Sequence, residues 1–476
     1  MSNNIVRSRP LGMSKLEKYS SVRHDFNCYQ SVAESAVYTK TGLDSKNSLG
    51  FFYKALKNVI AEHASLNLVI HGESTESPTL GFPETIDLKN HVVWVSGQTT
   101  KEEENKLIEK GIGTKYKDID SIPPWKVIVV PRGDALSATF FFHHSIGDGT
   151  SGKLFLVSLL KSLNQTETND NETLENADVD SIVNVPESLS IPPSVEQVID
   201  MPIGYWHLIK IFGAKWGLIS KPETWSGGPV PDIVNGELLP PTNIAKLSIS
   251  TQEMNKLQKE SKIRGTTITA LITAIAVASV AKGLPESDPS SVISYSIPRN
   301  LRPLSTSLNL ATRMGVYVAS INGAISRTSV TPTTFDPEEA WKISTNIKKS
   351  IQETLDQGST NLDTGLLKYV NNLREFFTSL MGKPRGRSIE MSSLVVSESE
   401  VASASGPGGW VMDELFFFQC ANLFGAPLCF SSLGYKGGQL NISCVWGTGV
   451  VEDKLVDKVL ENFKTYVHIL VESIKN

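Results

Sequence analysis

The stretch "FFHHSIGDGTSGKL", residues 141–154, joins a run of aromatic residues to two adjacent histidines, a glycine-rich turn and the start of a helix. On an extended strand, successive side chains point to opposite faces, so His143 and His144 cannot both serve one site. One of them would face a reaction while the other packs. Asp148 follows four residues after His144, where it could fix the loop or orient an imidazole.

This spacing favours a histidine base. A neutral imidazole suits general-base catalysis near neutral pH, because its unperturbed pKa is about 6.5. Gly147 and Gly149 would permit the turn that brings Asp148 within reach. An arbitrary pair of adjacent histidines is usually structural, but a pair at a strand end followed by x-x-x-Asp-Gly is less common.

The same stretch permits a nucleotide-binding alternative. Gly147, Gly152 and Lys153 fit the phosphate-loop pattern G-x-x-x-x-G-K between a strand and a helix. Leu154, however, stands where that loop needs a Ser or Thr for Mg²⁺, and the pattern leaves both histidines unexplained. A nucleotide-binding protein that uses residues 147–153 is therefore the weaker alternative.

Other catalytic chemistries find little support. No further histidine lies within 50 residues of the turn, and there is no H-E-x-x-H segment, so we predict no metal site. A G-x-S-x-G nucleophile elbow is also absent from the sequence. The four cysteines form no CxxC pair, which indicates a reducing compartment: they are Cys28, Cys420, Cys429 and Cys444.

Composition predicts a cytoplasmic globular protein. With 476 residues, 40% of them hydrophobic, the chain can bury a large core and favours two or more domains. Its 45 basic and 50 acidic residues give a net charge of −5, with no basic cluster typical of nucleic-acid binding. The N-terminus has no signal-peptide pattern, and the apolar segment 266–283 is too short and too polar to span a membrane. We expect a buried helix there.

The N-terminal half alternates helices and strands. Residues 15–70 predict two helical segments and a strand beginning at Leu66. Residues 123–130 and 135–142 predict a β-hairpin, because "PRGD" between them supplies turn residues. The helix after the histidine turn could be capped by Thr150 or Ser151. The acidic segment 164–180 has no periodicity and predicts a surface loop.

The second half follows a Pro/Gly-rich connector. We place an N-terminal subdomain at 1–185, the connector with one short aromatic helix at 186–241, and a C-terminal subdomain at 242–476. The last of these predicts a strand at 245–250, a helix from Thr251, and strands at 291–303 and around a Gly437–Gly438 hairpin turn. Residues 452–475 predict an amphipathic helix, which would pack on the sheet rather than lie on a membrane.

Three segments together resemble one acyltransferase superfamily. "HHSIGDG" (143–149) is similar to the HHxxxDG motif of chloramphenicol-acetyltransferase-like enzymes and peptide-synthetase condensation domains. "IPRNLRP" (297–303) resembles the arginine segment that follows a strand in this superfamily. Residues 9–38 resemble the opening of the fungal alcohol acetyltransferases. "ANLFGAP" (421–427) departs from the D-F-G-W-G segment of the plant enzymes, which favours the fungal branch.

The resemblance implies a fold and roles for individual residues. The fold would be α/β, with two chloramphenicol-acetyltransferase-like subdomains of mixed sheets flanked by helices, meeting at a central tunnel. His144 would be the general base. Asp148 would pair with Arg302 and hold the loop rather than relay protons. His143, Gly147 and Gly149 would support the site structurally.

The implied activity is CoA-dependent O-acyl transfer in a monomeric enzyme. Acetyl-CoA, or another acyl-CoA, would be a co-substrate with no bound cofactor, and the acceptor would be a fusel alcohol, a sterol or a secondary metabolite. N-acetylation of an amine by the same base stays open. The basic loop "KPRGR" could meet the CoA phosphates, although a solvated loop is the favoured explanation: its charged residues are Lys383, Arg385 and Arg387.

Overall fold

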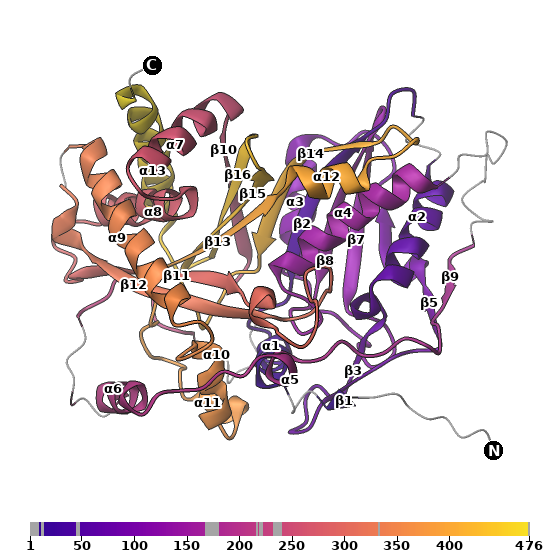
Figure 1. The fold of residues 1–476 in the computed structure, drawn as a ribbon, viewed down its shortest axis with the longest axis horizontal. Coiled ribbons are helices and arrows are strands. Elements are labelled where there is room, and N and C mark those ends of the chain that lie inside the picture. Colours follow the sequence, from indigo (N-terminus) through magenta and orange to yellow (C-terminus); the bar gives the residue numbers. More distant parts are fainter. Residues whose placement is uncertain are drawn as a thin grey trace. The chain divides into compact units, whose positions relative to one another are not determined.

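A computed structural model describes residues 9–10, 14–43, 48–166, 180–215, 218, 222–231, 240–331 and 334–474. By internal contacts the chain divides into two units (Figure 1). Unit 1 comprises Met1–Val198, Ser305–Tyr317 and Leu394–Cys420, and unit 2 comprises the remaining segments. These units interleave along the sequence, whereas the boundaries drawn at 185 and 241 are linear. Those boundaries stay a prediction.

A five-stranded mixed sheet forms the centre of unit 1. Its strand order is β14-β2-β8-β7-β6, with the bounds Val411–Gln419, Val32–Thr39, Ala135–Phe142, Trp125–Arg132 and Val92–Trp94. The predicted hairpin is confirmed as the antiparallel pair β7–β8. The two helices predicted within 15–70 are confirmed at Lys15–Asp25 and Leu49–Glu62, and the strand predicted from Leu66 begins at Val69. The prediction missed β2, a buried strand between β8 and β14. Its sequence, VAESAVYT, shows no regular alternation of apolar and polar residues that would predict a strand.

Strand β14 reaches this sheet from the C-terminal half of the chain. In Figure 1 it is the orange strand beside the indigo β2. The two run antiparallel, with Phe417 opposite Glu34 and Phe418 opposite Ala33. The sheet that carries the histidine turn is therefore completed by residues more than 250 positions later in the sequence, which sequence periodicity alone could not pair.

Helices cover this sheet, and α4 begins directly after the histidine turn. The longer ones are α1 (Lys15–Asp25), α2 (Leu49–Glu62), α3 (Lys101–Ile112) and α4 (Gly149–Gln165), and α12 (Glu398–Ala404) contacts α4. Phe155 of α4 stacks on Phe140 of β8 with ring centroids 3.8 Å apart. The cap of α4 is Asp148, not Thr150 or Ser151 as predicted, because the Asp148 carboxylate accepts the Ser151 N–H.

Two small sheets complete unit 1. One has the order β1-β4-β3, with bounds Arg9–Pro10, Thr79–Gly81 and Val69–His71. The other pairs β5 (Thr85–Asp87) with β9 (Ile182–Asn184). In the predicted acidic loop, α4 continues to Gln165, and residues 167–179 lie outside the described residues.

Unit 2 is built on a six-stranded mixed sheet of order β10-β16-β15-β13-β11-β12. The predicted second-half strands are confirmed, including the β15–β16 hairpin with Gly437 in its turn at φ +79°. The strand bounds in sheet order are Thr242–Ile249, Leu440–Gly447, Leu428–Tyr435, Ile389–Val396, Val292–Asn300 and Val318–Ser326. Short helices of this unit are α6 (Tyr205–Lys215), which confirms the aromatic helix, α10 (Asp363–Leu366) and α11 (Leu373–Thr378).

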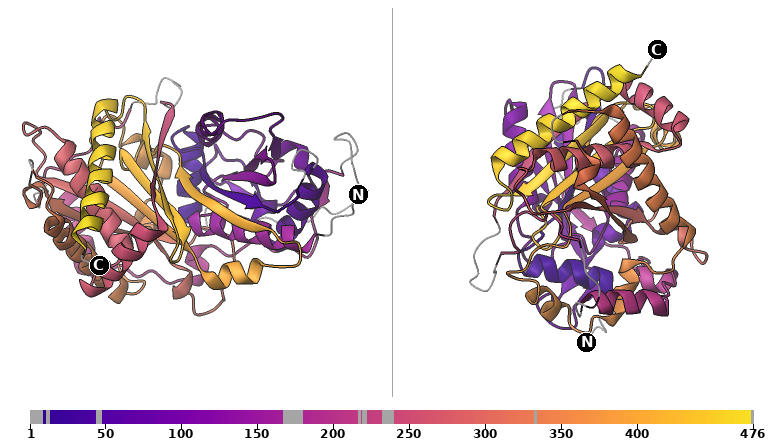
Figure 2. Two further views of the ribbon diagram at one scale, coloured as in Figure 1. Left: turned by 90° about the horizontal axis from the view of Figure 1, so that it is seen from above. Right: turned by 90° about the vertical axis from the view of Figure 1, so that its left-hand side faces the viewer.

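Four longer helices pack on the unit 2 core: α7 (Thr251–Ile263), α8 (Ile268–Gly283), α9 (Pro337–Asp356) and α13 (Asp453–Ser473). Nearly every residue of α8 is buried, as predicted for the apolar segment. The terminal helix α13 lies along this core, as Figure 2 shows in yellow, and Phe463 stacks on Phe430 of β15. In the described segments no single helix is both long and apolar enough to cross a membrane.

Candidate active site

The histidine turn begins where β8 ends and is held by backbone bonds at both sides. The His143 N–H donates to the Pro124 carbonyl at 2.9 Å, and the Ile146 N–H donates to the His143 carbonyl at 3.0 Å. The Ser145 hydroxyl donates to the Glu17 carbonyl of α1 at 2.8 Å. The turn is thus bonded to Pro124, the residue just before β7, and to α1, so the two histidine side chains leave it in defined directions.

His143 is fully buried and its ring is bonded at both nitrogens. Nδ1 accepts the Ser145 N–H at 2.9 Å, so the proton of the neutral ring lies on Nε2, which donates to Glu73 at 3.2 Å. Burial, with the nearby His24, lowers the pKa of His143 to about 4 against the opposing effect of Glu73. The ring is therefore neutral at physiological pH, and neither nitrogen is available to a substrate.

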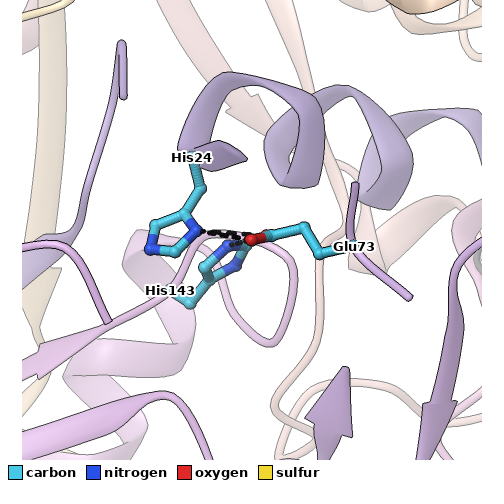
Figure 3. A group of neighbouring side chains, drawn as sticks. All are labelled: His24, Glu73 and His143. Atoms are coloured by element: carbon cyan, nitrogen blue, oxygen red, sulfur yellow. Dashed lines mark hydrogen bonds and ion pairs between the residues drawn. The ribbon is translucent and has the colours of Figure 1, made fainter. Parts of the chain in front are cut away.

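A second histidine, from α1, shares the same carboxylate. His24 Nδ1 lies 3.0 and 3.1 Å from the two Glu73 oxygens, and its Nε2 accepts the Tyr116 N–H at 3.2 Å. Figure 3 shows both imidazoles directed at Glu73. Burial opposes ionisation of Glu73, but the hydrogen bonds from His143 and His24 outweigh it and hold the pKa of that carboxyl well below its usual range.

Distance along the sequence was a poor guide to the neighbours of the turn. The prediction of no metal site rested on the lack of a histidine within 50 residues, yet His24 lies with its ring centroid 4.4 Å from that of His143. Together with Glu73 these residues bring three potential ligand atoms within 4.8 Å of one another. Sequence reasoning missed His24 and Glu73, because the tertiary fold alone brings α1 and the β3–β4 turn to this strand end.

His144 differs from His143 in its exposure and in the bonding of its ring. The residue is partly exposed, while its Nδ1 is buried and bonds to no other residue of the described chain. The ring lies 5.8 Å from that of Tyr29. Burial and the positive charge of Arg23 lower the pKa of His144 to about 4, against the opposing effects of its own backbone and Asp148.

Arg23 is a buried cation beside this histidine. Its guanidinium lies between two aromatic rings, 4.7 Å from the centroid of Tyr19 and 4.4 Å from that of Tyr29. The Tyr29 hydroxyl donates to Gln419 of β14 at 2.9 Å, which fixes the ring between Arg23 and His144. Within the described part of the chain, no carboxylate forms an ion pair with Arg23. Its positive charge opposes protonation of His144.

Asp148 ties the turn to a distant segment of unit 1. One carboxylate oxygen accepts the Ser151 N–H at 3.0 Å, and the other accepts the Tyr317 N–H at 3.0 Å. The Asp148 N–H donates to the Gly315 carbonyl at 3.2 Å, and the Gly315 N–H donates to the Ser151 hydroxyl at 3.0 Å. Both oxygens of Asp148 are engaged in structural bonds.

The two turn glycines leave room for close neighbours, and neither adopts a left-handed backbone conformation. Neither Gly147 nor Gly149 has a positive φ. A Cβ on Gly147 would lie 3.0 Å from Ser151, and one on Gly149 would lie 3.1 Å from Phe417 of β14. The expectation that they permit the turn is therefore refined: they let α4 and β14 approach it closely.

One further buried acid lies beneath α4. Both carboxylate oxygens of Glu34 are buried and make no hydrogen bond in the described chain. A Cβ on Gly152 would lie 2.4 Å from one of these oxygens, so α4 can cover the carboxyl only because residue 152 is glycine. Burial raises the pKa of Glu34 well above its usual range and so favours the neutral form of this carboxyl.

The phosphate-loop lysine has a different partner. Lys153 Nζ lies 2.6 Å from a carboxylate oxygen of Glu400 in α12, an acidic neighbour that disfavours phosphate at the same position. Leu154 supplies no hydroxyl for a metal ion. The geometry around Lys153 is that of a contact between α4 and α12.

The remaining predicted residues lie in unit 2. Arg302 is buried at the end of β11 and bonds to Asn300, with its N–H 3.0 Å from Oδ1. Its pairing with Asp148 stays a prediction. Arg385 is buried, with Nε donating to the Leu423 carbonyl at 3.1 Å, whereas Lys383 is exposed. A CoA-binding role for Lys383, Arg385 and Arg387 stays a prediction, which the burial of Arg385 disfavours for that residue.

Solved structures define the class of fold. A trichothecene 15-O-acetyltransferase from Fusarium sporotrichioides, TRI3, is similar with a TM-score of 0.71 at 13% identity, covering 98% of this chain and 95% of that one. The condensation domain of the polyketide synthase MokA is similar with a TM-score of 0.61 at 13% identity and 99% coverage of both chains. The protein therefore has the two-lobed α/β fold of condensation-domain and chloramphenicol-acetyltransferase-like acyltransferases.

Sequence comparison then gives the family. The chain is 23% identical over 490 aligned positions to the probable alcohol acetyltransferase FCK4 of Fusarium pseudograminearum, covering 98% of this chain and 95% of the relative. It is 22% identical to the probable alcohol acetyltransferase crmB of Aspergillus fumigatus, covering 96% and 99%. A model of the alcohol acetyltransferase family matches residues 93–467. The chain belongs to the alcohol acetyltransferase family, and it is an acetyltransferase of this type.

Proposed function

We propose that this enzyme transfers an acetyl group from acetyl-CoA to the hydroxyl of a small or hydrophobic alcohol, with His144 as the general base. The contrast between the two motif histidines carries the proposal. Both ring nitrogens of His143 are bonded within the protein, whereas His144 is partly exposed and its Nδ1 bonds to no other described residue. Because Nδ1 of His144 is buried, Nε2 is the nitrogen that a substrate hydroxyl could reach.

The chemical step needs one base and no covalent acyl-enzyme. Nε2 of His144 takes the proton from the acceptor hydroxyl while the oxygen attacks the carbonyl carbon of the acetyl thioester. The carbon–sulfur bond then breaks, and the CoA thiolate leaves and receives the proton from the imidazolium. Base and acid are the same imidazole, so the enzyme returns to its starting state.

The other motif residues would support this step. Asp148 and the glycines hold the turn. The low pKa of His144 keeps the imidazole unprotonated throughout the physiological range, and it also makes that imidazole a weaker base than free histidine. Arg302 is proposed to add a charge partner for Asp148. The acceptor classes that the proposal covers are fusel alcohols, sterols and hydroxylated secondary metabolites.

Replacement of His144 by Ala tests the proposal. General-base catalysis contributes about 10²–10⁴-fold, so His144→Ala should lower kcat by at least that factor while the protein stays folded. The purified enzyme and acetyl-CoA would be incubated with an extract of the source organism, and products that gain one acetyl mass would be identified. Turnover retained in a folded His144→Ala variant would refute the mechanism, and products acetylated only on amines would refute the proposed acceptor class.

A further inference from the structure

Glu73 lies in the turn between β3 and β4, far in sequence from the histidine motif. The turn starts at Gly72, which has a φ of +63°, and closes with the Thr75 N–H donating to the Gly72 carbonyl at 2.9 Å. Lys18 of α1 donates to the backbone carbonyl of Glu76. This bond also holds the turn to α1, and the Glu73 side chain points toward His24 and His143 (Figure 3).

The Glu73 carboxylate collects donors from two elements. Ser21 and His24 lie three residues apart on α1, so they share one helix face, and both contact this carboxylate, Ser21 at 3.3 Å. His143 approaches from the end of β8 at 3.2 Å. One ionised side chain thus joins helix α1 to the strand end that delivers the histidine pair.

Backbone groups behind the two rings fix the positions of their protons. The Ser145 N–H donates to Nδ1 of His143, and the Tyr116 N–H donates to Nε2 of His24. Each of those nitrogens must therefore offer a lone pair, which places the protons on the nitrogens that face Glu73. His143 is the Nε2–H tautomer and His24 is the Nδ1–H tautomer.

The same proton positions argue against a metal ion at this cluster, although its composition suits one. A neutral imidazole that binds a metal through one nitrogen carries its proton on the other and donates it outward. Here the outward nitrogens accept hydrogen bonds from the backbone N–H groups of Ser145 and Tyr116. Metal binding would protonate these nitrogens, so that at each ring two N–H groups would point at each other. The cluster is built for a carboxylate that receives two protonated nitrogens.

We propose that Glu73 is a positioning residue of the active site: it holds the ring of His143 and, through the peptide that His143 and His144 share, orients the general base. This inference rests on the proposed role of His144. With both nitrogens of His143 bonded, the ring cannot rotate, and the backbone at residues 143–145 is bonded on both sides. Loss of the carboxylate would release the ring and leave a partly ordered turn from which His144 is presented in several orientations.

Histidine NMR tests the clamp without any need for activity. In protein labelled with ¹⁵N and ¹³C at histidine, His24 and His143 would be assigned by loss of their signals in His24→Gln and His143→Gln. We expect His24 as the Nδ1–H form, which is the minor form of free histidine, and His143 as the Nε2–H form. In Glu73→Gln, at least one of these tautomers should be lost or exchange. If both rings are Nε2–H in the unaltered protein, the clamp does not exist.

Kinetics test whether the clamp positions the base. We expect Glu73→Gln to lower kcat about tenfold or more with the KM for acetyl-CoA and for the alcohol unchanged, as for other residues that orient a functional imidazole. Glu104→Gln is the matched control, because Glu104 is a buried carboxylate that accepts from Ser137 of β8 at 2.5 Å, toward the opposite end of that strand. Glu104→Gln should lower the melting temperature about as much as Glu73→Gln does and leave kcat unchanged.

Each contrary outcome has a distinct meaning. Wild-type kcat in folded Glu73→Gln, or an equal loss of kcat in Glu104→Gln, would overturn the positioning role while the test on His144 stands. Retained turnover in His144→Ala would overturn the proposed function and leave the NMR result untouched. A stoichiometric zinc site in the unaltered protein, lost in Glu73→Gln, would show that the cluster binds metal and would overturn the clamp.

Discussion

The carboxylate of Asp148 accepts the backbone N–H of Tyr317, 169 positions later in the chain, at 3.0 Å. The same carboxylate caps helix α4 through Ser151, so the end of the histidine turn, the start of α4 and the segment around Tyr317 share one anchor. A motif aspartate four residues from the proposed general base could relay protons. In this chain its oxygens are occupied by backbone donors.

Asp148→Ala should therefore lower stability more than the loss of an ordinary helix cap. Loss of a cap costs about 0.5–2 kcal/mol, and the unsatisfied buried Tyr317 N–H adds about 1–3 kcal/mol to the free energy of unfolding. Urea unfolding measures the change. Asp336→Ala is the control, because Asp336 caps the exposed start of α9 and should show the cap term alone. If Asp148→Ala lowers only the rate and leaves the unfolding midpoint unchanged, the structural role is wrong.

The pH dependence of turnover should reflect the lowered pKa of His144. With that pKa at about 4, the imidazole is neutral at pH 7 and stays so as the pH falls to about 5. We expect kcat/KM to be level between these values and to drop tenfold per pH unit only below about 4. Circular dichroism at each pH would separate this titration from acid unfolding. A decline that begins near pH 6.5 in folded enzyme would contradict a lowered pKa.

Arg23 should be the main charged group behind this lowering. Its guanidinium has no carboxylate partner in the described chain, and its charge opposes protonation of His144. Arg23→Gln should move the acidic limb of the kcat/KM profile toward pH 6.5, while Arg23→Lys should hold it near the original position. The measurement is the same pH profile on the two variants. An unmoved limb in folded Arg23→Gln would show that burial alone sets the pKa.

Glu34 should make the protein less stable as the pH rises. Its folded pKa is raised above the unfolded value of about 4.5, so the unfolded chain releases this proton first. The penalty is absent below about pH 4.5 and accumulates above it, and Glu34→Gln removes it. The melting temperature of Glu34→Gln should match that of the unaltered protein at pH 4.5 and exceed it at pH 7. Equal values at both pH values would mean that the carboxyl finds a partner.

Lys153 distinguishes the acyltransferase from the nucleotide-binding alternative. Its ion pair with Glu400 is partly exposed, so Lys153→Met should cost under about 1 kcal/mol of stability and leave acetyl transfer within about twofold of the unaltered enzyme. Calorimetry with Mg-ATP should show no binding to either protein. Binding of Mg-ATP that is lost in Lys153→Met would revive the phosphate-loop explanation.

Local pattern was a sound guide wherever one element decides its own structure. The hairpin before the histidines, the buried helix at 266–283 and the terminal amphipathic helix were all predicted from periodicity and turn residues, and all are confirmed. Strand β2 was missed because its Glu, Ser and Thr residues interrupt the apolar pattern of a strand. They are buried only because β2 lies between β8 and β14, and β14 comes from much later in the chain. Pairing with a strand from a distant part of the chain cannot be predicted from the hydrophobic periodicity of β2 itself.

The sequence by itself determined which reactive groups are present: two adjacent histidines at a strand end, an aspartate four residues on, and glycines in the turn that joins them. Alternation along a strand already required that the two histidines differ. Only the tertiary structure decided how they differ, because His24, Glu73, Arg23 and Tyr29 reach the turn from other elements. Burial, proton position and pKa depend on what surrounds a side chain in space, and those neighbours are distant in sequence.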